Sequence, residues 1–366
     1  MRGIFEVDLR IFAENVRKIR AFLPKNISYF SVIKADAYGL GLEKIVRFVD
    51  KNLASSTQGF AVANVWEAQK IRTLGSMLPI IILSPMLPAE VAELRESNAV
   101  PMVSSRQEID QLEQYAAEKN SDQEIQIAID TGMGRAGVWY KDLGNFLEYV
   151  RTAGQHLKIT GYGTHYASIE TDPQQTIEQH ERFLSVIPKN SPQTAMLHAS
   201  SSFGIDKFAD GTNTVRIGIL QYGYPETDPL VKKLHLKSVA SLKGFVVLIK
   251  SLPRGVKVGY EATCQLKRDT KIALLSVGYA DGISRDMSGS VLIRGHRCPT
   301  LGLVSMDTIT VDVTDLPEVS VGDEVVFWGS QGRDTISLDE FSRFSKCNYR
   351  LCTSYLSDRI ERKYIE

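Results

Sequence analysis

Residues 31–41 read SVIKADAYGLG, and the stretch begins inside an apolar run at residues 27–33. The run ends at Lys34, which is followed by small residues, Tyr38 and two glycines. A lysine at the end of a buried strand is costly unless its amine is used, because desolvation lowers the amine pKa and allows attack on an aldehyde. A strand-end lysine taken alone is more often a solvated cap, so other stretches must support a covalent role for Lys34.

Eight apolar runs alternate with helical patterns over the first two thirds of the chain. Most runs are continuous, which is typical of strands buried on both faces. The expected strands are residues 27–33, 59–64, 79–84, 100–104, 124–130, 157–166, 194–202 and 214–220. Their order predicts an α/β fold, a (β/α)8 barrel of the TIM type. An open doubly wound sheet is the alternative, because periodicity does not show closure.

Helix-start signals separate several of these runs. Residues 8–23 carry one apolar stripe, with Asp8 as the expected cap. Ser105 with Glu108 predicts a capping box, and Asp172 before Pro173 predicts a capped helix start. Residues 203–211 are short for a full helix.

From about Leu234 the pattern changes to short strands broken by Gly, Pro and Asp turns. The expected strands are residues 244–252, 271–277, 290–294 and 324–328, with one helix at 337–344. We therefore predict two domains, a barrel at residues 1–233 and a β-rich domain at residues 234–366. Residues 1–8 are candidates to pair with the second domain.

Composition gives no sign of nucleic acid or a membrane surface as a partner. The 366 residues contain 43 Lys+Arg and 43 Asp+Glu, so the net charge is zero. No apolar run approaches a membrane span, and the N-terminus lacks a signal-peptide core. We expect a cytoplasmic protein without a metal site. Its cysteines form no CxxC pair and are expected to be reduced thiols: Cys264, Cys298, Cys347 and Cys352.

In such a barrel the reactive groups lie at the C-terminal ends of the strands. The polar residues at the expected strand ends are Lys34, Asp130 with Arg135 beyond it, His165, Ser200 to Ser202, and Arg216 with Gly218 and Ile219. Barrels often bind phosphate after strands seven and eight, where the serines and the RIG segment fall. Each residue alone also fits a core or surface role, and only their shared rim favours a site.

Seven motifs, taken together, resemble those of alanine racemases, which depend on pyridoxal 5'-phosphate (PLP) and have fold type III. They are VIKADAYGLG, IDTGMGRAGV, GTHYAS, VRIGILQYG, VGYEAT, VGYADG and LVSMDTITVDV, in the family's order. The similarity extends from the N-terminal helix to Tyr355. It implies a (β/α)8 barrel followed by a β domain, and a head-to-tail homodimer whose active sites draw on both chains. It implies an isomerase that interconverts L-alanine and D-alanine and supplies D-alanine for peptidoglycan.

The resemblance also implies roles for individual residues. Lys34 would carry PLP covalently, and its phosphate would be bound by Tyr38, Ser202, Gly218, Ile219 and Tyr355. Arg216 would face the pyridine nitrogen, and His165 would lie against the ring. Arg135 would contact the substrate, Tyr260 and Met306 would enter from the partner chain, and Tyr279 would narrow the entrance.

Racemisation requires proton transfer on both faces of one carbon, which two bases can perform. The resemblance gives Tyr260 the proton of the L form and Lys34 that of the D form. A tyrosine pKa is about 10, so lowering it by about three units needs roughly 4 kcal/mol of phenolate stabilisation. A hydrogen-bond chain through His165 and Arg216 is the expected source.

The sequence departs from the family pattern at four positions. Ala128 replaces a lysine that is carbamylated in many relatives, so we expect chloride or another acceptor beside Arg135. Glu261, Ser201 and Ser305 also differ from the common residues. These changes leave serine or a broader range open as substrates. The alternative functions are a fold type III PLP decarboxylase, a non-catalytic PLP-binding barrel and a cofactor-free barrel.

Overall fold

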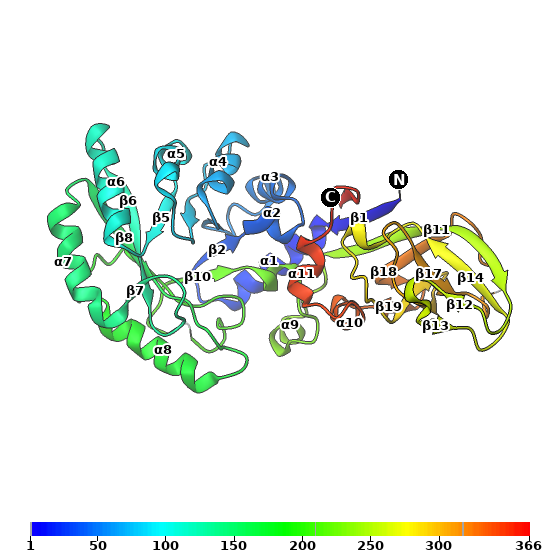
Figure 1. The fold of residues 1–366 in the computed structure, drawn as a ribbon. Helices are drawn as coiled ribbons and strands as arrows, with labels where there is room; N and C mark the ends of the chain where they lie inside the picture. Colours follow the sequence, from blue (N-terminus) through cyan, green and yellow to red (C-terminus); the bar gives the residue numbers. More distant parts are fainter. Residues whose placement is uncertain (1, 209, 317) are drawn as a thin grey trace. The chain divides into compact units, whose positions relative to one another are not determined.

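The computed structural model describes residues 2–208, 210–316 and 318–366, and they form two compact units (Figure 1). One unit contains residues 16–37 and 42–221. The other contains the described parts of residues 1–15, 38–41 and 222–366. The predicted boundary between residues 233 and 234 stays a prediction.

The first unit is a closed barrel of eight parallel strands. Neighbouring strands pair in the order β5-β4-β3-β2-β10-β9-β8-β6, and a pairing between β5 and β6 closes the ring. The strands are β2 (Ser28–Val32), β3 (Gly59–Val62), β4 (Ile80–Ile82), β5 (Val100–Val103), β6 (Gln123–Asp130), β8 (Leu157–Gly163), β9 (Met196–His198) and β10 (Thr214–Ile217). The predicted barrel is confirmed, and the doubly wound alternative is wrong.

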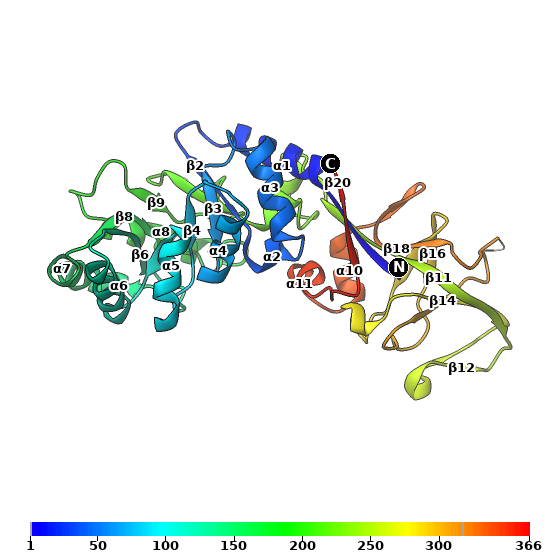
Figure 2. The same ribbon diagram turned by 90° about the horizontal axis from the view of Figure 1, so that it is seen from above.

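Helices connect most of the barrel strands and cover the outside of the ring (Figure 2). Around the barrel these are α1 (Leu9–Phe22), α3 (Leu42–Asn52), α4 (Val65–Thr73), α5 (Val91–Ser97), α6 (Arg106–Glu118), α7 (Leu143–Ala153) and α8 (Pro173–Val186). The predicted caps are present: Asp8 Oδ1 accepts from the Ile11 amide, Ser105 Oγ from the Glu108 amide and Asp172 Oδ1 from the Gln175 amide. The described residues between β9 and β10 form turns instead of a helix.

Three barrel strands end three or four residues earlier than the apolar patterns predicted. β8 stops at Gly163, β9 at His198 and β10 at Ile217, so His165, the serine run and Gly218 lie in loops. Beyond these ends single backbone bonds remain, such as that from the Arg216 amide to the Ser200 carbonyl at 3.1 Å, while side chains bond across the loops. Ser200 Oγ, for example, donates to the Phe208 carbonyl at 2.8 Å.

The second unit is built around a mixed sheet in the order β16-β15-β18-β11-β1-β20, with β14, β17 and β19 paired beside it. Its strands are β1 (Gly3–Asp8), β11 (Ala240–Leu252), β14 (Thr270–Leu275), β15 (Ser290–Ile293), β16 (His296–Pro299), β17 (Ile309–Asp312), β18 (Glu324–Gln331), β19 (Asp334–Ile336) and β20 (Glu361–Ile365). A separate hairpin joins β12 (Lys257–Val258) to β13 (Cys264–Gln265).

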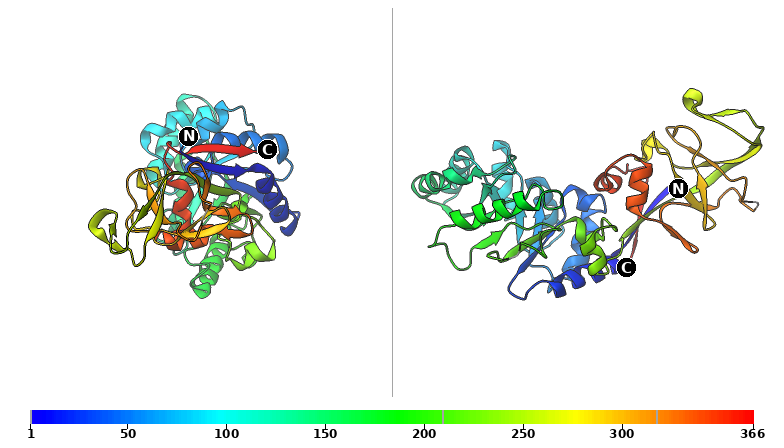
Figure 3. Two further views of the ribbon diagram at one scale, coloured as in Figure 1. Left: turned by 90° about the vertical axis from the view of Figure 1, so that its right-hand side faces the viewer. Right: turned by 90° about the horizontal axis from the view of Figure 1, so that it is seen from below.

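Strand β1 joins the two ends of the chain within this unit. It pairs antiparallel with β11 and parallel with β20, so the blue and red strands lie side by side in the left view of Figure 3. Alternate residues of β1 are buried, and the Phe5 ring packs edge-on against the buried Trp328 at 6.0 Å. Aromatic burial of this kind dominates core stability.

Three short helices complete the second unit: α9 (Pro229–Lys233), α10 (Leu338–Phe344) and α11 (Tyr349–Ser354). Helix α10 confirms the predicted helix at 337–344, with Ser337 Oγ accepting from the Glu340 amide. Of the helices in the described residues, none has the length and apolar character needed to cross a bilayer.

Candidate active site

The backbone after β2 forms one left-handed turn, α2 (Lys34–Tyr38). Ala35, Asp36, Ala37 and Tyr38 have φ values of 53°, 54°, 54° and 59°, and the Ala37 amide donates to the Ile33 carbonyl at 2.9 Å. Left-handed helical backbone costs about 1–2 kcal/mol per residue for L-amino acids. Surrounding contacts must therefore hold the turn, and strained backbone of this kind is concentrated at functional sites.

Glu67, which the sequence analysis missed, holds this turn. Its side chain is 4% exposed; Oε1 accepts from the Ala35 amide at 2.6 Å and Oε2 from the Ala63 amide at 2.7 Å. One buried carboxylate thus joins the end of β3 to the residue after Lys34. The available signal was the N-x-x-E pattern that starts α4, in which Asn64 Oδ1 accepts from the Glu67 amide at 3.0 Å.

The Lys34 amine lies in a partly desolvated, cationic environment. Burial, then Arg135 and Arg216, lower the pKa of Lys34, while the Glu67 carboxylate opposes the shift. A lowered pKa increases the fraction of neutral, nucleophilic amine. The desolvation expected at this position is therefore present, and the covalent role of Lys34 stays a prediction.

Arg216, on β10, is the centre of a buried hydrogen-bond network. Its guanidinium donates to the Thr164 carbonyl at 2.7 Å, to the His198 carbonyl at 3.1 Å and to His198 Nδ1. Since arginine can only donate, His198 Nδ1 accepts, and Nε2–H donates to Gln126 Oε1 at 2.7 Å. His198 is therefore neutral and a core hydrogen-bonder, and burial lowers its pKa well below 6.5.

The same guanidinium reaches His165. Arg216 Nη2 lies 3.4 Å from His165 Nδ1, and burial together with Arg216, Arg135 and Lys34 lowers the pKa of His165 to about 3. Burial also lowers the pKa of Arg216 to about 10, which keeps it protonated near neutral pH. His165 is then neutral, accepts at Nδ1 and has Nε2–H available to donate.

Asp130, the last residue of β6, shapes the loop that carries Arg135. Its Oδ1 accepts from the amides of Gly132, Met133 and Gly134 at 2.9, 3.0 and 3.1 Å. Arg135 is exposed, and within the described residues its guanidinium has no hydrogen-bond or ion-pair partner. Ala128, also on β6, is buried and provides no anion.

Ser202 links the loops after β9 and β10. Its buried Oγ accepts from the amides of Gly218 and Leu220 at 3.1 and 3.3 Å, which leaves the hydroxyl proton to donate. Ile219 lies between these two amides and begins a short 3-10 turn. The barrel unit thus gathers Lys34, Arg135, His165, Ser202, Arg216, Gly218 and Ile219 at one end, as the strand-end rule predicts.

Tyr38 and Tyr355 belong to the β-rich unit and lie on neighbouring segments of it. A methyl group on Gly39 would lie 2.2 Å from the Thr353 carbonyl oxygen, so Gly39 and α11 pack backbone to backbone. Only glycine allows this approach at a φ of 82°. Tyr355 is the C-cap of α11 and is 66% exposed.

The remaining predicted residues lie on loops of the β-rich unit. Tyr260 begins a 3-10 turn between β12 and β13 and is 60% exposed. Tyr279 and Met306 are neighbours, because the Tyr279 amide donates to the Ser305 carbonyl and the Ala280 amide to that of Met306, both at 3.0 Å. Glu261 forms an exposed ion pair with Arg285 at 2.9 Å.

The closed barrel, the half-buried lysine after its first strand and the β-rich unit define the class of two-domain fold type III proteins. Residues 7–226 match the family "Alanine racemase, N-terminal domain", and residues 239–364 match "Alanine racemase, C-terminal domain". The chain belongs to the alanine racemase family.

Relatives match over nearly the whole chain. Alanine racemase from Halothermothrix orenii is 35% identical over 98% of this chain and 96% of its own length. Alanine racemase from Methylacidiphilum infernorum is 34% identical over 99% of this chain and 92% of its own length. The structure of alanine racemase from Bacillus anthracis with bound L-Ala-P has a TM-score of 0.89 at 29% identity, covering 100% of this chain and 95% of that one.

Replacing Glu67 by glutamine is expected to lower the free energy of unfolding by about 1–3 kcal/mol, because one buried amide loses its acceptor. Urea unfolding of the variant measures the loss. Glu93→Gln, at an exposed position of α5, is the matched control. Equal stability of the two variants would show that Glu67 does not hold the turn.

Acid should destabilise the cofactor-free protein through His165 and His198. The folded state lowers the pKa of both histidines. Below a pH of about 6.5 the unfolded chain therefore binds protons at these histidines, whereas the folded chain does not. Each histidine then reduces the free energy of unfolding by up to about 1.4 kcal/mol per pH unit. Urea unfolding at several pH values should give a shallower slope for His165→Gln than for the parent, with His296→Gln as the matched control; equal slopes would contradict the assignment.

Proposed function

We propose that this protein is a PLP-dependent isomerase that interconverts L-alanine and D-alanine. The observation that carries the proposal is Lys34: a half-buried amine of lowered pKa, held at the end of a barrel strand by a strained turn. The full-length match to alanine racemases supports alanine as the substrate. Serine or a broader substrate range is the nearest alternative.

The donor set at the barrel end fits an anionic cofactor with an aldehyde. Lys34 offers the amine, Ser202 a free hydroxyl proton beside the amides of Gly218 and Ile219, and Arg216 a guanidinium that cannot accept a proton. Tyr38 and Tyr355 would complete the phosphate site, and His165 would lie against the ring. When bound, PLP supplies the electron sink that weakens the bond from the α-carbon to hydrogen.

Two residues would move the protons. Lys34 Nζ would serve one face of the α-carbon, and Tyr260 Oη of a partner subunit the other. The 60% exposure of Tyr260 supports a role in contact with a second chain. Neutral His165, bonded to Arg216, can donate Nε2–H to a phenolate and so lower the pKa of that tyrosine.

The substrate side is assigned to Arg135, Met306 and Tyr279. The exposed guanidinium of Arg135 suits a substrate carboxylate, and Tyr279 and Met306, which lie next to each other in the β-rich unit, would narrow the entrance. Because Ala128 carries no anion, we infer that chloride binds beside Arg135. An anomalous-scattering map of crystals grown with bromide tests this, and an empty map would reject it.

Arg216 should limit side reactions, because an arginine at the pyridine nitrogen disfavours a protonated ring and so weakens the electron sink. Arg216→Glu is expected to raise transamination relative to racemisation. Pyruvate released per D-alanine formed measures this ratio. No increase in a variant that still binds PLP would contradict the role.

Incubation with L-alanine and a coupled assay for D-alanine tests the function, repeated with serine and lysine. We expect D-alanine as the main product and no loss of carbon dioxide. Carbon dioxide release without D-alanine would favour a fold type III decarboxylase, and a colourless protein without product would favour a cofactor-free barrel. We also propose a cytoplasmic homodimer with shared active sites that supplies D-alanine for peptidoglycan, as the resemblance implies.

A further inference from the structure

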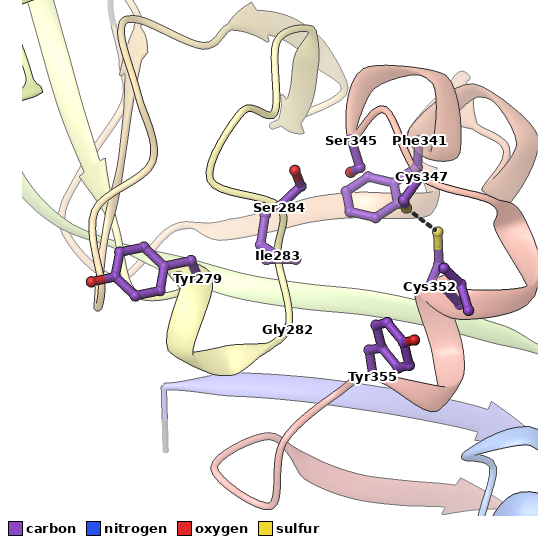
Figure 4. A pocket seen from close by; sticks show the side chains of 10 residues that line it. Tyr279, Gly282, Ile283, Ser284, Phe341, Ser345, Cys347, Cys352 and Tyr355 are labelled. Carbon is purple, nitrogen blue, oxygen red and sulfur yellow. Dashed lines mark hydrogen bonds between the residues drawn. The ribbon is translucent and has the colours of Figure 1, made fainter. Parts of the chain in front are cut away.

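Two cysteines of the β-rich unit lie in contact. The Cys347 and Cys352 sulfurs are 3.3 Å apart, with Cys347 just before α11 and Cys352 within it (Figure 4). Cys352 Sγ also lies 3.7 Å from the Asn348 carbonyl. The other two cysteines, Cys264 and Cys298, are on β13 and β16. All four are free thiols, as the sequence predicts.

The pair borders a cavity of about 410 Å³. Cys347 is half-buried and Cys352 is 4% exposed, so Cys347 is the more accessible sulfur. Ser345, beside Cys347 in Figure 4, has a buried hydroxyl with no hydrogen-bond partner among the described residues. The cavity lining includes Tyr279, Phe341, Ser345, Cys347, Cys352 and Tyr355. A polar molecule bound there would lie next to the accessible thiol.

The two thiols differ in reactivity. Burial and the neighbouring Cys347 raise the pKa of Cys352, so Cys352 is a poor first nucleophile. The nucleophile in thiol–disulfide exchange is a thiolate that the oxidant can reach. Cys347 therefore suits the attacking position, and Cys352 the resolving position.

We propose that Cys347 and Cys352 form a redox-active dithiol that a small disulfide such as glutathione disulfide oxidises to an intramolecular disulfide. Cys347 loses its proton to solvent and attacks one sulfur of the reagent, which releases one thiolate and leaves a mixed disulfide. Cys352 then loses its proton and attacks the Cys347 sulfur, which releases the second thiolate. Both thiolates take up protons, and two electrons pass from the protein to the reagent.

Closure changes the helix that abuts the predicted cofactor segment. The sulfurs must approach from 3.3 Å to about 2.05 Å, which moves the start of α11. Thr353 of α11 packs directly on Gly39, and Gly39 follows Tyr38. If Tyr38 and Tyr355 hold phosphate, as the proposed function states, the oxidised protein holds PLP less tightly.

Peptide mapping of the full-length protein tests the dithiol. Trypsin cleaves after Lys346, Arg350 and Arg359, so the cysteines fall in different peptides, 347–350 and 351–359. After treatment with glutathione disulfide, we expect these peptides joined by a disulfide, and separate again after dithiothreitol. A stable glutathione adduct on Cys347, or two unreacted thiols, would overturn the proposal.

Single substitutions separate the two positions. Cys352→Ser should trap the glutathione adduct on Cys347, whereas Cys347→Ser should react slowly and form no joined peptide. Cys264→Ser keeps both thiols and is the matched control, which should behave as the parent. Equal reactivity of Cys347→Ser and the parent would overturn the assigned order of attack.

Cofactor retention tests the coupling. We expect the oxidised holoprotein to bind PLP about tenfold more weakly than the reduced form, and dithiothreitol to restore the affinity. The same oxidant should leave the PLP affinity of Cys352→Ser unchanged, because this variant cannot form the disulfide. Formation of the disulfide with unchanged PLP affinity would overturn the proposed coupling between the dithiol and the cofactor. A reduced protein that binds no PLP would instead refute the proposed function, and the peptide map would still report on the dithiol.

Discussion

Replacing Lys34 by alanine is expected to lower the rate of racemisation about a thousandfold or more, because a single amine both carries the cofactor and transfers a proton. The variant should also lose PLP during gel filtration. D-alanine formation and the PLP absorbance of the eluted protein measure the two effects.

The matched control is Lys51→Ala, at an exposed position of α3, which should keep both rate and cofactor. Full activity of Lys34→Ala would remove the covalent role. Loss of activity with normal, reducible PLP attachment would assign that attachment to another lysine.

Tyr260→Phe should reduce racemisation about a hundredfold to ten-thousandfold, because the phenol hydroxyl is the base for one face. The amine of Lys34 should still exchange the α-hydrogen on its own face. In heavy water we therefore expect the variant to introduce α-deuterium into D-alanine faster than into L-alanine, without converting one into the other.

Glu261→Gln, in the same 3-10 turn, keeps the phenol and removes the exposed ion pair to Arg285, so it serves as the control. Exposed ion pairs contribute little, and we expect near-parent rates. Equal loss of exchange for both enantiomers in Tyr260→Phe would argue against separate faces for the two bases.

Periodicity predicted the barrel well, because parallel strands buried on both faces leave continuous apolar runs such as residues 27–33 and 124–130. Periodicity did not show that the sheet closes into a barrel, because closure depends on the pairing of β5 with β6, which no local sequence signal marks. The strand at residues 3–8 was only a candidate partner of the second domain, and β20 was not predicted. Both depend on pairing between distant ends of the chain.

The resemblance, not periodicity, supplied the site residues in the β-rich unit. Physical reasoning from the sequence found Lys34 but not the left-handed turn. The segment KADAY, residues 34–38, contains no glycine that would suggest a positive φ. Physical reasoning also missed Glu67. The role of this residue depends on the amides of Ala35 and Ala63, which lie far apart in the sequence and meet at its carboxylate only in the fold. The Cys347–Cys352 contact could not be predicted either, because it depends on the backbone conformation just before α11, where Lys346 has a φ of 50°.

The central claim is that each active site combines Lys34 of one subunit with Tyr260 of its partner. Mixing inactive Lys34→Ala with inactive Tyr260→Phe under conditions of subunit exchange tests it most directly, because every hybrid dimer would contain one site with both bases. We predict recovery of about a quarter of the parent activity at equal ratio, since half of the dimers would be hybrids with one of two sites intact. Subunit exchange verified by mass spectrometry with no recovered activity would contradict the claim.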